Sequence, residues 1–323
     1  MIDLFPLFKK TAEYRAIVSD KKKGALSHAY LTITSDDRFL DDYLRIIAKT
    51  IVCENGDPCN KCRKCVLIDK NAYSDVKFYP KDASVKTEDV TEIIEESYIK
   101  PIESDKKVFI VSHAETMLEA AQNKLLKTLE EPPQNVHIII GATSEFSLLP
   151  TVKSRAKKFV IPTFSGEDLF GALVGECEDE EKLKVAISAC DGTVGGAYSL
   201  YFDENLKNII RVVGRVITEM QSSGEVLKFS NEVLSLGVDL KEFLSVLLSA
   251  LRELLFLGEG KDTGVGELKD AVKNAKGFTR GAIVNAIEKT NEALARKKYN
   301  GNDQMIVEWL LFNILEGKYK WRK

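Results

Sequence analysis

The sequence lacks the features that direct a chain into a membrane or an export pathway. Nowhere do about eighteen consecutive apolar residues occur, which is the length that a helix needs to cross a bilayer. Residues 1–6 contain no basic stretch followed by an apolar run. We therefore expect a cytoplasmic protein without a membrane partner.

A strong charge of one sign is also missing. The 323 residues include 46 Lys and Arg against 49 Asp and Glu, for a formal net charge of -3. A protein that binds nucleic acid by itself usually relies on a positive surface that releases counterions. We therefore expect any DNA contact to be local or shared with partners. The basic groups at 296–298 and 318–323 are interpreted as solvated helix ends.

Internal repeats and low-complexity tracts are absent, and 44% of the residues are hydrophobic. This composition is typical of a globular protein, and the length suggests two or three domains. In the first half, short apolar runs alternate with helical stretches, a pattern that favours a buried parallel sheet with helices on both faces. The runs expected to form strands are 29–33, 76–79, 108–111, 136–140 and 159–161.

An apolar stripe between the third and fourth runs predicts a helix that packs on the sheet and ends before Pro132. The residues of this stripe are Met117, Leu118, Ala121, Leu125, Leu126 and Leu129.

After Ile161 the strand pattern stops. Ser165 and Asp168 have the spacing of a capping box and predict the start of a helical region. We infer an α/β domain over 1–163, a small helical domain over 164–203 and a helical C-terminal domain over 204–323. A glycine-rich turn is expected at 192–196, and a loop at 258–266.

Four of the six cysteines lie between residues 53 and 65. Cys53, Cys59, Cys62 and Cys65 are spaced so that a short loop can arrange four thiolates as a tetrahedron around zinc. No histidine or carboxylate pair accompanies them, so the predicted site is closed to substrate and structural. The alternative is four free thiols that are prone to oxidation.

Basic residues lie among these cysteines, and we interpret them as a solvated loop face rather than a nucleic-acid contact. The remaining Cys177 and Cys190 are expected to be buried core residues.

Four segments occur in the order seen in bacterial clamp-loader subunits: LSHAYL at 26–31, the cysteine cluster, NKLLKTLEEPP at 123–133, and Ser154–Arg155. The chain therefore resembles this AAA+ family, firmly over 26–164. The resemblance implies an AAA+ type parallel-sheet α/β domain, a small helical lid domain and an all-α collar domain. It also implies a ring shared with gamma/tau and delta subunits of DNA polymerase III, which acts on the sliding clamp and primed DNA.

The departures from the family pattern lie at the residues that bind ATP in active relatives. Active relatives carry a phosphate loop, Gly-x4-Gly-Lys-Ser/Thr, after the first strand. The corresponding residues here are Thr34, Phe39, Leu40 and Asp41, so both glycines and the lysine are missing. Additional aspartates in this segment place negative charge where a phosphate would lie.

Two further elements of an ATP site are missing. Ser112 and His113 stand where an Asp-Glu pair would hold magnesium and the catalytic water. The sequence implies no nearby partner that would make His113 a ligand or a base, so we expect a histidine at a helix entry with a satisfied side chain. Gly195 stands where active relatives carry a phosphate-sensing arginine. These departures predict that the chain binds no ATP. The cofactor that we expect is the structural zinc ion of the cysteine cluster.

Arg155 matches the arginine of the family's Ser-Arg-Cys motif, although Ala156 replaces the cysteine. The resemblance implies that Arg155 acts as an arginine finger, which reaches the ATP site of a neighbouring subunit. Two alternatives remain open. Instead of a clamp-loader subunit that hydrolyses no ATP, the chain could be an ATP-hydrolysing gamma/tau-type subunit with a divergent loop, or an independent zinc-dependent nucleic-acid-binding protein.

Overall fold

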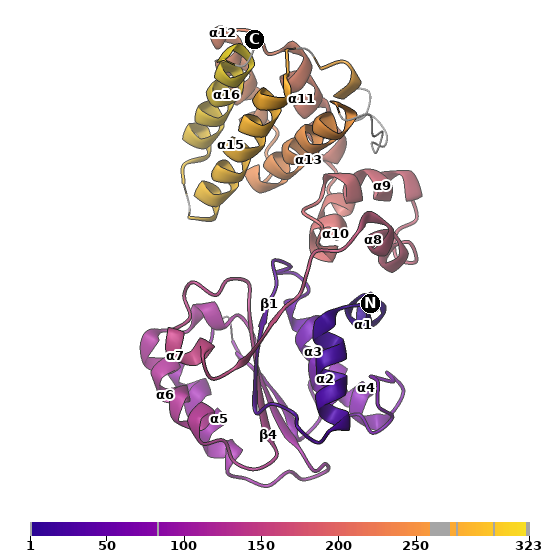
Figure 1. Ribbon diagram of the computed structural model, residues 1–323, viewed down its shortest axis with the longest axis vertical. Coiled ribbons are helices and arrows are strands. Elements are labelled where there is room, and N and C mark those ends of the chain that lie inside the picture. The colour runs from indigo at the N-terminus through magenta and orange to yellow at the C-terminus, as the bar shows by residue number, and fades with distance from the viewer. Residues whose placement is uncertain (1, 83, 259–271, 276, 300, 321–323) are drawn as a thin grey trace. The chain divides into compact units, whose positions relative to one another are not determined.

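The computed structural model describes residues 2–82, 84–258, 272–275, 277–299 and 301–320. The chain divides into two compact units, Met1–Phe164 and Ser165–Lys323 (Figure 1). The separation of a lid domain at 164–203 from a collar domain at 204–323 stays a prediction. Apart from Gly258, the predicted loop at 258–266 lies outside the described residues.

The first unit is built on a parallel sheet of five strands, which confirms the predicted fold class. All five expected runs form strands, and every recorded strand pair is parallel. Across the sheet the order is β2 (Val76–Tyr79), β3 (Lys107–Val111), β4 (Val136–Ala142), β1 (Ala29–Ile33) and β5 (Lys157–Val160). The two central strands β3 and β4 are buried along their whole length, as continuous apolar runs predict.

Helices cover both faces of this sheet (Figure 1). Helices α5 and α6 pack together on one face, while α2 and α3 lie on the other. The helices of the unit are α1 (Phe5–Lys9), α2 (Ala12–Lys22), α3 (Leu40–Val52), α4 (Arg63–Asp69), α5 (Thr87–Ser97), α6 (Glu119–Glu130) and α7 (Pro150–Lys153), with a 3-10 turn at Ala114–Thr116. The core lies between these layers, where burial of apolar side chains drives folding.

Helix α6 corrects one detail of the predicted stripe. Ala121, Leu125 and Leu129 are buried against the sheet as expected. The helix begins only at Glu119, so Leu118 precedes it and its side chain is 74% exposed. The prediction for Leu118 is wrong because a periodic pattern does not reveal where the first turn begins.

A buried carboxylate fixes the segment between α5 and β3. Asp75 is fully buried, and one of its oxygens accepts a hydrogen bond from the amide of Ile102 at 2.7 Å. The other oxygen accepts from the amides of Glu103 and Ser104, each at 2.8 Å. Three backbone donors therefore converge on one negative charge, a strong arrangement in a protein interior.

The second unit consists of helices throughout its described part. Ser165 begins the first of them by accepting a hydrogen bond from the amide of Asp168 at 3.2 Å, which confirms the predicted N-cap. The helices are α8 (Gly166–Leu173), α9 (Glu180–Ala189), α10 (Val194–Phe202), α11 (Leu206–Glu219), α12 (Ser223–Ser235), α13 (Leu240–Gly258), α15 (Arg280–Lys298) and α16 (Asp303–Lys320). With the parallel-sheet unit before them, they form the α/β-then-helical architecture expected of an AAA+ clamp-loader subunit.

Lys318 contradicts the interpretation of residues 318–323 as a solvated helix end. Its side chain is buried, and its ammonium donates to the carbonyls of Ile217 and Met220, each at 3.1 Å. These carbonyls lie at the C-terminal end of α11, where a helix attracts positive charge. A run of basic residues in the sequence does not show which of their side chains packs inward.

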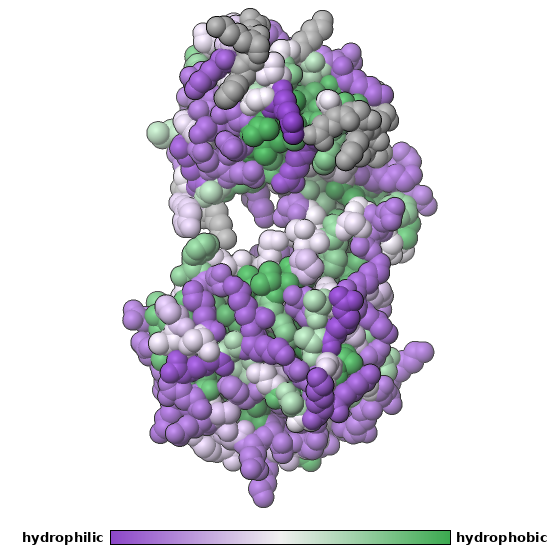
Figure 2. All heavy atoms as spheres, viewed as in Figure 1, coloured by the Kyte–Doolittle hydropathy of each residue, from purple (hydrophilic) through white to green (hydrophobic). Residues whose placement is uncertain are grey.

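No helix in the described part of the chain combines the length and the apolar character required to span a bilayer. Hydrophilic residues cover most of the surface that Figure 2 shows, with hydrophobic residues in smaller groups between them.

We predict that Asp75→Asn destabilises the first unit by about 2–4 kcal/mol. Asparagine keeps one acceptor oxygen, so at least one amide of the segment 102–104 loses its partner and faces an NH2 group instead. Urea unfolding followed by far-UV circular dichroism measures the loss. Asp82→Asn is the matched control, because Asp82 is exposed and its partner among the described residues is the likewise exposed Lys86.

Tryptophan fluorescence provides an internal reference in the same experiment. Both tryptophans, Trp309 and Trp321, follow Phe164 in the sequence, and Trp309 belongs to the second unit, so the transition that fluorescence reports should not move. Equal stability of the two aspartate variants would contradict the role given to Asp75.

Candidate metal centre and nucleotide-site positions

The four clustered cysteines come together in space as predicted. Their Sγ atoms all lie within 4.8 Å of one another. The Cys59 sulfur is 3.7 Å from that of Cys53 and 3.9 Å from that of Cys65. Zinc–sulfur bonds of about 2.3 Å in a tetrahedron place two sulfurs about 3.8 Å apart. The cluster therefore has the dimensions of a four-thiolate zinc site.

Local backbone geometry shapes the loop between the cysteines. Gly56 and Asn60 adopt positive φ angles of 86° and 54°, which glycine and asparagine tolerate best. Cys62 begins α4, and its sulfur accepts the amide of Cys65 at 3.4 Å. The amide of Cys62 in turn donates to the Cys59 sulfur at 3.3 Å. These bonds help to hold the sulfurs of Cys59 and Cys62 in place within the cluster.

The thiols of this cluster differ in their electrostatic surroundings. Hydrogen bonds from the backbone of Lys61 and Cys62 and from the Asn55 side chain lower the pKa of Cys59 to about 5. Burial raises the pKa of Cys65 well above its usual range. Four thiolates so close together repel one another unless a cation lies between them. A divalent ion compensates this repulsion, so the donor set fits zinc.

The loop is attached to the helices α1 and α2. Asp57 accepts hydrogen bonds from Lys9, at 2.7 Å, and from the hydroxyl of Tyr14, and the pKa of Asp57 is lowered, first by Lys9 and then by Tyr14. Lys21 donates to the carbonyls of Thr50 at 2.7 Å and Cys53 at 2.5 Å. No local pattern in the sequence indicates these supports, because they join residues far apart in the chain.

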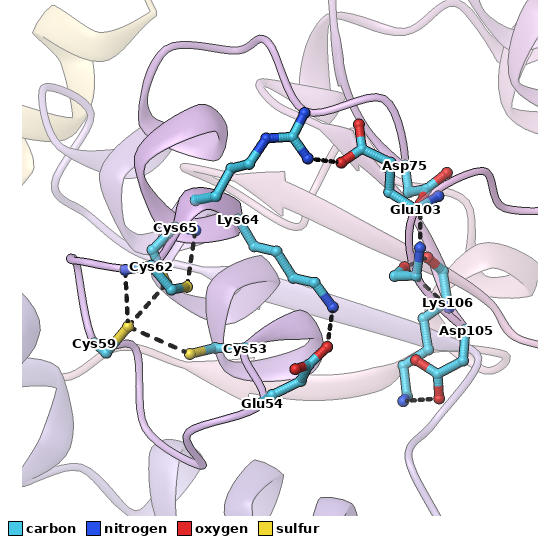
Figure 3. A network of polar contacts seen from close by, with 12 residues as sticks. Cys53, Glu54, Cys59, Cys62, Lys64, Cys65, Asp75, Glu103, Asp105 and Lys106 are labelled. Atoms are coloured by element: carbon cyan, nitrogen blue, oxygen red, sulfur yellow. Dashed lines mark hydrogen bonds and ion pairs between the residues drawn. The ribbon is translucent and has the colours of Figure 1, made fainter.

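Two basic residues of the loop form ion pairs within this chain. Figure 3 shows Lys64 paired with Glu54 beside the cysteines, and Arg63 pairs with Glu103 of the segment held by Asp75. Two of the three positive charges among the cysteines therefore have carboxylate partners in the same unit. This favours the interpretation of a solvated face over that of a nucleic-acid surface.

The residues at the phosphate-loop positions form a short connection between β1 and α3. Thr34 is buried, and its amide donates to the carbonyl of Ala142 at 3.2 Å. The Thr34 hydroxyl accepts the amide of Asp36 at 3.1 Å, and the Asp36 carboxylate accepts the amide of Phe39 at 3.3 Å. The connection thus uses its own backbone donors, the groups that cradle phosphates in a phosphate loop.

The side chains at the next two positions of this motif, Leu40 and Asp41, contact the rest of the first unit. Leu40 is fully buried at the start of α3. The carboxylate of Asp41 accepts a short hydrogen bond from the hydroxyl of Ser112, the residue after β3. The structure therefore brings together two positions predicted independently, one from each half of an ATP site.

His113 lies close to two carboxylates. Its Nδ1 atom is 3.6 Å from a carboxylate oxygen of Asp37 and 3.8 Å from one of Glu115. The residue has a positive φ of 49° and precedes the 3-10 turn. Its place directly before this turn agrees with the expected histidine at a helix entry. The sequence did not imply Asp37 as a neighbour, because Asp37 belongs to the loop after β1, far away in the sequence.

Gly195 lies in the first turn of α10, not in a turn between elements as predicted. Thr193 caps this helix by accepting the amide of Gly196 at 2.9 Å. Of the glycine-rich stretch, Gly192 has the positive φ, 83°, that a turn requires. The glycines alone did not reveal that the threonine between them starts a helix.

Arg155 lies between α7 and β5, and its side chain is 33% exposed. One terminal nitrogen donates to the carbonyl of Thr151 at 2.9 Å. The other is 2.5 Å from a carboxylate oxygen of Glu130, the last residue of α6. The sequence did not identify Glu130 as a partner, although it stands within the LEEPP string. Ala156 packs against the core, and Cys177 and Cys190 are buried as expected.

We predict that the purified protein contains one zinc ion per chain. Cys59→Ser removes a ligand, so zinc measured by mass spectrometry after dialysis should fall well below one equivalent, and the first unit should unfold at lower temperature. Cys177→Ser is the control, because Cys177 is buried elsewhere and should not change the zinc content. Zinc-free protein whose stability is insensitive to a chelator would contradict the assignment.

Comparison with known proteins connects these features to replication. Residues 9–165 match the family model described as DNA polymerase III, delta subunit. DNA polymerase III subunit gamma of Buchnera aphidicola is 27% identical over 270 residues, which span 75% of this chain and 74% of the relative. DNA polymerase III subunit delta' of Bacillus subtilis is 25% identical over 306 residues, 92% of this chain and 93% of the relative.

Among solved structures, the clamp-loader delta protein of Bacillus subtilis matches 94% of this chain and 99% of its own, with 13% identity and a TM-score of 0.36. A TM-score this low supports no family assignment, so the assignment depends on the sequence matches. These span the parallel-sheet unit with its cysteine cluster and, in the longest cases, most of the helical unit. The chain belongs to the clamp-loader family and is a clamp-loader subunit of DNA polymerase III.

Proposed function

We propose that this chain is the delta prime subunit of a bacterial clamp loader. In this role it hydrolyses no ATP itself, and it helps the ring of gamma/tau and delta subunits to load the sliding clamp onto primed DNA. Its own contribution to chemistry is Arg155, which completes the ATP site of a neighbouring subunit.

The hydrogen bond between Asp41 and Ser112 carries the first half of this proposal. In an active site of this type, a hydroxyl from the phosphate loop and a carboxylate after the third strand of the chain share a magnesium ion. Here the carboxylate of Asp41 stands at a phosphate-loop position, in the first turn of α3, and the Ser112 hydroxyl follows the strand, so they bind each other directly. The two positions are thus joined by a hydrogen bond that needs no metal ion.

Charge and backbone geometry support the same conclusion. Leu40 supplies no cation for the phosphates, and its side chain is buried. Asp36 is buried within the loop and binds the amide of Phe39. A triphosphate would have to displace this carboxylate and approach further aspartates, which Coulomb repulsion opposes.

Arg155 supports the second half of the proposal. Its guanidinium is partly exposed and permanently charged, so it suits the stabilisation of negative charge on a phosphate of another subunit. In the clamp-loader family, the arginine at this motif position has that role. The neighbouring subunit would provide the phosphate loop, magnesium and catalytic water.

The similarity to gamma subunits keeps a second function under consideration. Gamma relatives share 27–28% identity over about three quarters of this chain, so a gamma/tau-type ATPase with a divergent loop has support from sequence. The delta' relative covers more of the chain, and the residues at the nucleotide positions favour it. An independent zinc-dependent nucleic-acid-binding role is disfavoured because Arg63 and Lys64 have carboxylate partners.

The decisive test uses a reconstituted complex in which only the subunit contacted by Arg155 retains a working ATP site. We expect Arg155→Ala to lower DNA-stimulated turnover at that site by on the order of 10³-fold. Arg155→Lys keeps the charge without the fork of donors and should restore little of the activity.

Arg211→Ala is the control for general effects of removing an exposed arginine, and size-exclusion chromatography verifies that each complex assembles. Unchanged turnover in an assembled Arg155→Ala complex would refute the arginine-finger role.

A further inference from the structure

The ion pair between Arg155 and Glu130 restrains the one side chain to which the proposed function assigns chemistry. Glu130 ends α6, whereas Arg155 follows α7, so two separate helices meet at this contact. The carbonyl of Thr151, in α7, holds the opposite terminal nitrogen at 2.9 Å. The guanidinium is therefore fixed at two points, one on each helix.

This restraint leaves part of the guanidinium available for hydrogen bonds to another molecule. A guanidinium has five N–H donors. Among the residues that the structure describes, Thr151, Glu130 and the Ser154 hydroxyl, the last through a long contact of 3.5 Å, take three of them. Two donors can thus meet an oxygen of another molecule while the first contacts persist. Because long side chains lose much conformational entropy when they are ordered, a group already held in place loses less on binding.

The position of Glu130 is unfavourable for α6 itself. The C-terminal end of a helix carries partial negative charge, so a carboxylate in the last turn lowers helix stability. Glu130 is the last residue of α6 and Glu131 follows it directly. A residue that opposes its local structure commonly has a function that compensates for it. The contact with Arg155 supplies such a function for Glu130.

We propose that Glu130 is a positioning residue, which holds Arg155 in the orientation needed at the neighbouring ATP site. This inference depends on the proposed arginine-finger role. In the reaction, a water oxygen bonds to the γ-phosphorus while its proton passes to a base of the neighbouring site or to solvent. The bond from that phosphorus to the bridging oxygen breaks, and ADP leaves with the electron pair. Arg155 contributes only charge and hydrogen bonds, and Glu130 touches neither ATP nor water.

The test compares Glu130→Ala and Glu130→Gln in the complex with one working ATP site. We expect Glu130→Ala to lower kcat roughly fivefold, the effect available from a partly exposed ion pair, with little change in KM for ATP. Glutamine keeps an acceptor oxygen for the guanidinium, so Glu130→Gln should recover most of the loss. Glu131→Ala is the matched control, because it removes the adjacent exposed carboxylate.

A double-mutant cycle separates positioning from a general structural effect. In an Arg155→Ala background, Glu130→Ala should cause no further loss, because the group that it positions is already gone. Thermal unfolding of the free chain should change little in Glu130→Ala, so a loss of turnover cannot be ascribed to unfolding.

The outcomes distinguish this inference from the proposed function. If Arg155→Ala lowers turnover but Glu130→Ala leaves it unchanged, the positioning role is wrong and the arginine finger stands. If Glu130→Ala lowers turnover equally with and without Arg155, Glu130 acts by another route and the inference is also wrong. If Arg155→Ala itself has no effect, the proposed function fails and this inference with it.

Discussion

The parallel sheet places the ends of β1 and β3 on either side of β4, and the proposed function depends on this constraint. Parallel strands direct their C-terminal ends toward one edge, where ligands bind in folds of this type. The segment after β1 and the residues after β3 meet at that edge. In this chain they meet as Asp41 and Ser112, joined by a hydrogen bond. Two segments that would have to bind a nucleotide in an ATP-hydrolysing subunit therefore bind one another at this edge.

The two other functional features lie outside this edge and are built differently. The cysteine loop has its own short-range geometry, supported by Lys21 and by Asp57 with its partners on α1 and α2. Arg155 depends on the meeting of α6 and α7, through Glu130 and Thr151. Loss of the contacts at one feature therefore need not disturb the others. A subunit organised in this way can give up its own nucleotide and still contribute a side chain to another subunit.

Much of this organisation could be predicted from the sequence because it depends on local patterns. All five strands were predicted from apolar runs, and the cysteines from their spacing. What could not be predicted depends on contacts between distant residues. Asp37 approaches His113, and Lys318 turns inward to the end of α11, although neither position differs in the sequence from a solvated one. Leu118 fits the stripe of α6 but precedes its first turn.

The central claim is that this chain binds no nucleotide of its own. Isothermal titration of the isolated, zinc-loaded protein with ATP and magnesium tests it most directly. The closed loop, the buried Leu40 and the contact between Asp41 and Ser112 predict no binding at ATP concentrations up to about 1 mM. Saturable binding with a micromolar Kd would contradict the account and favour an ATP-hydrolysing subunit of the gamma/tau type.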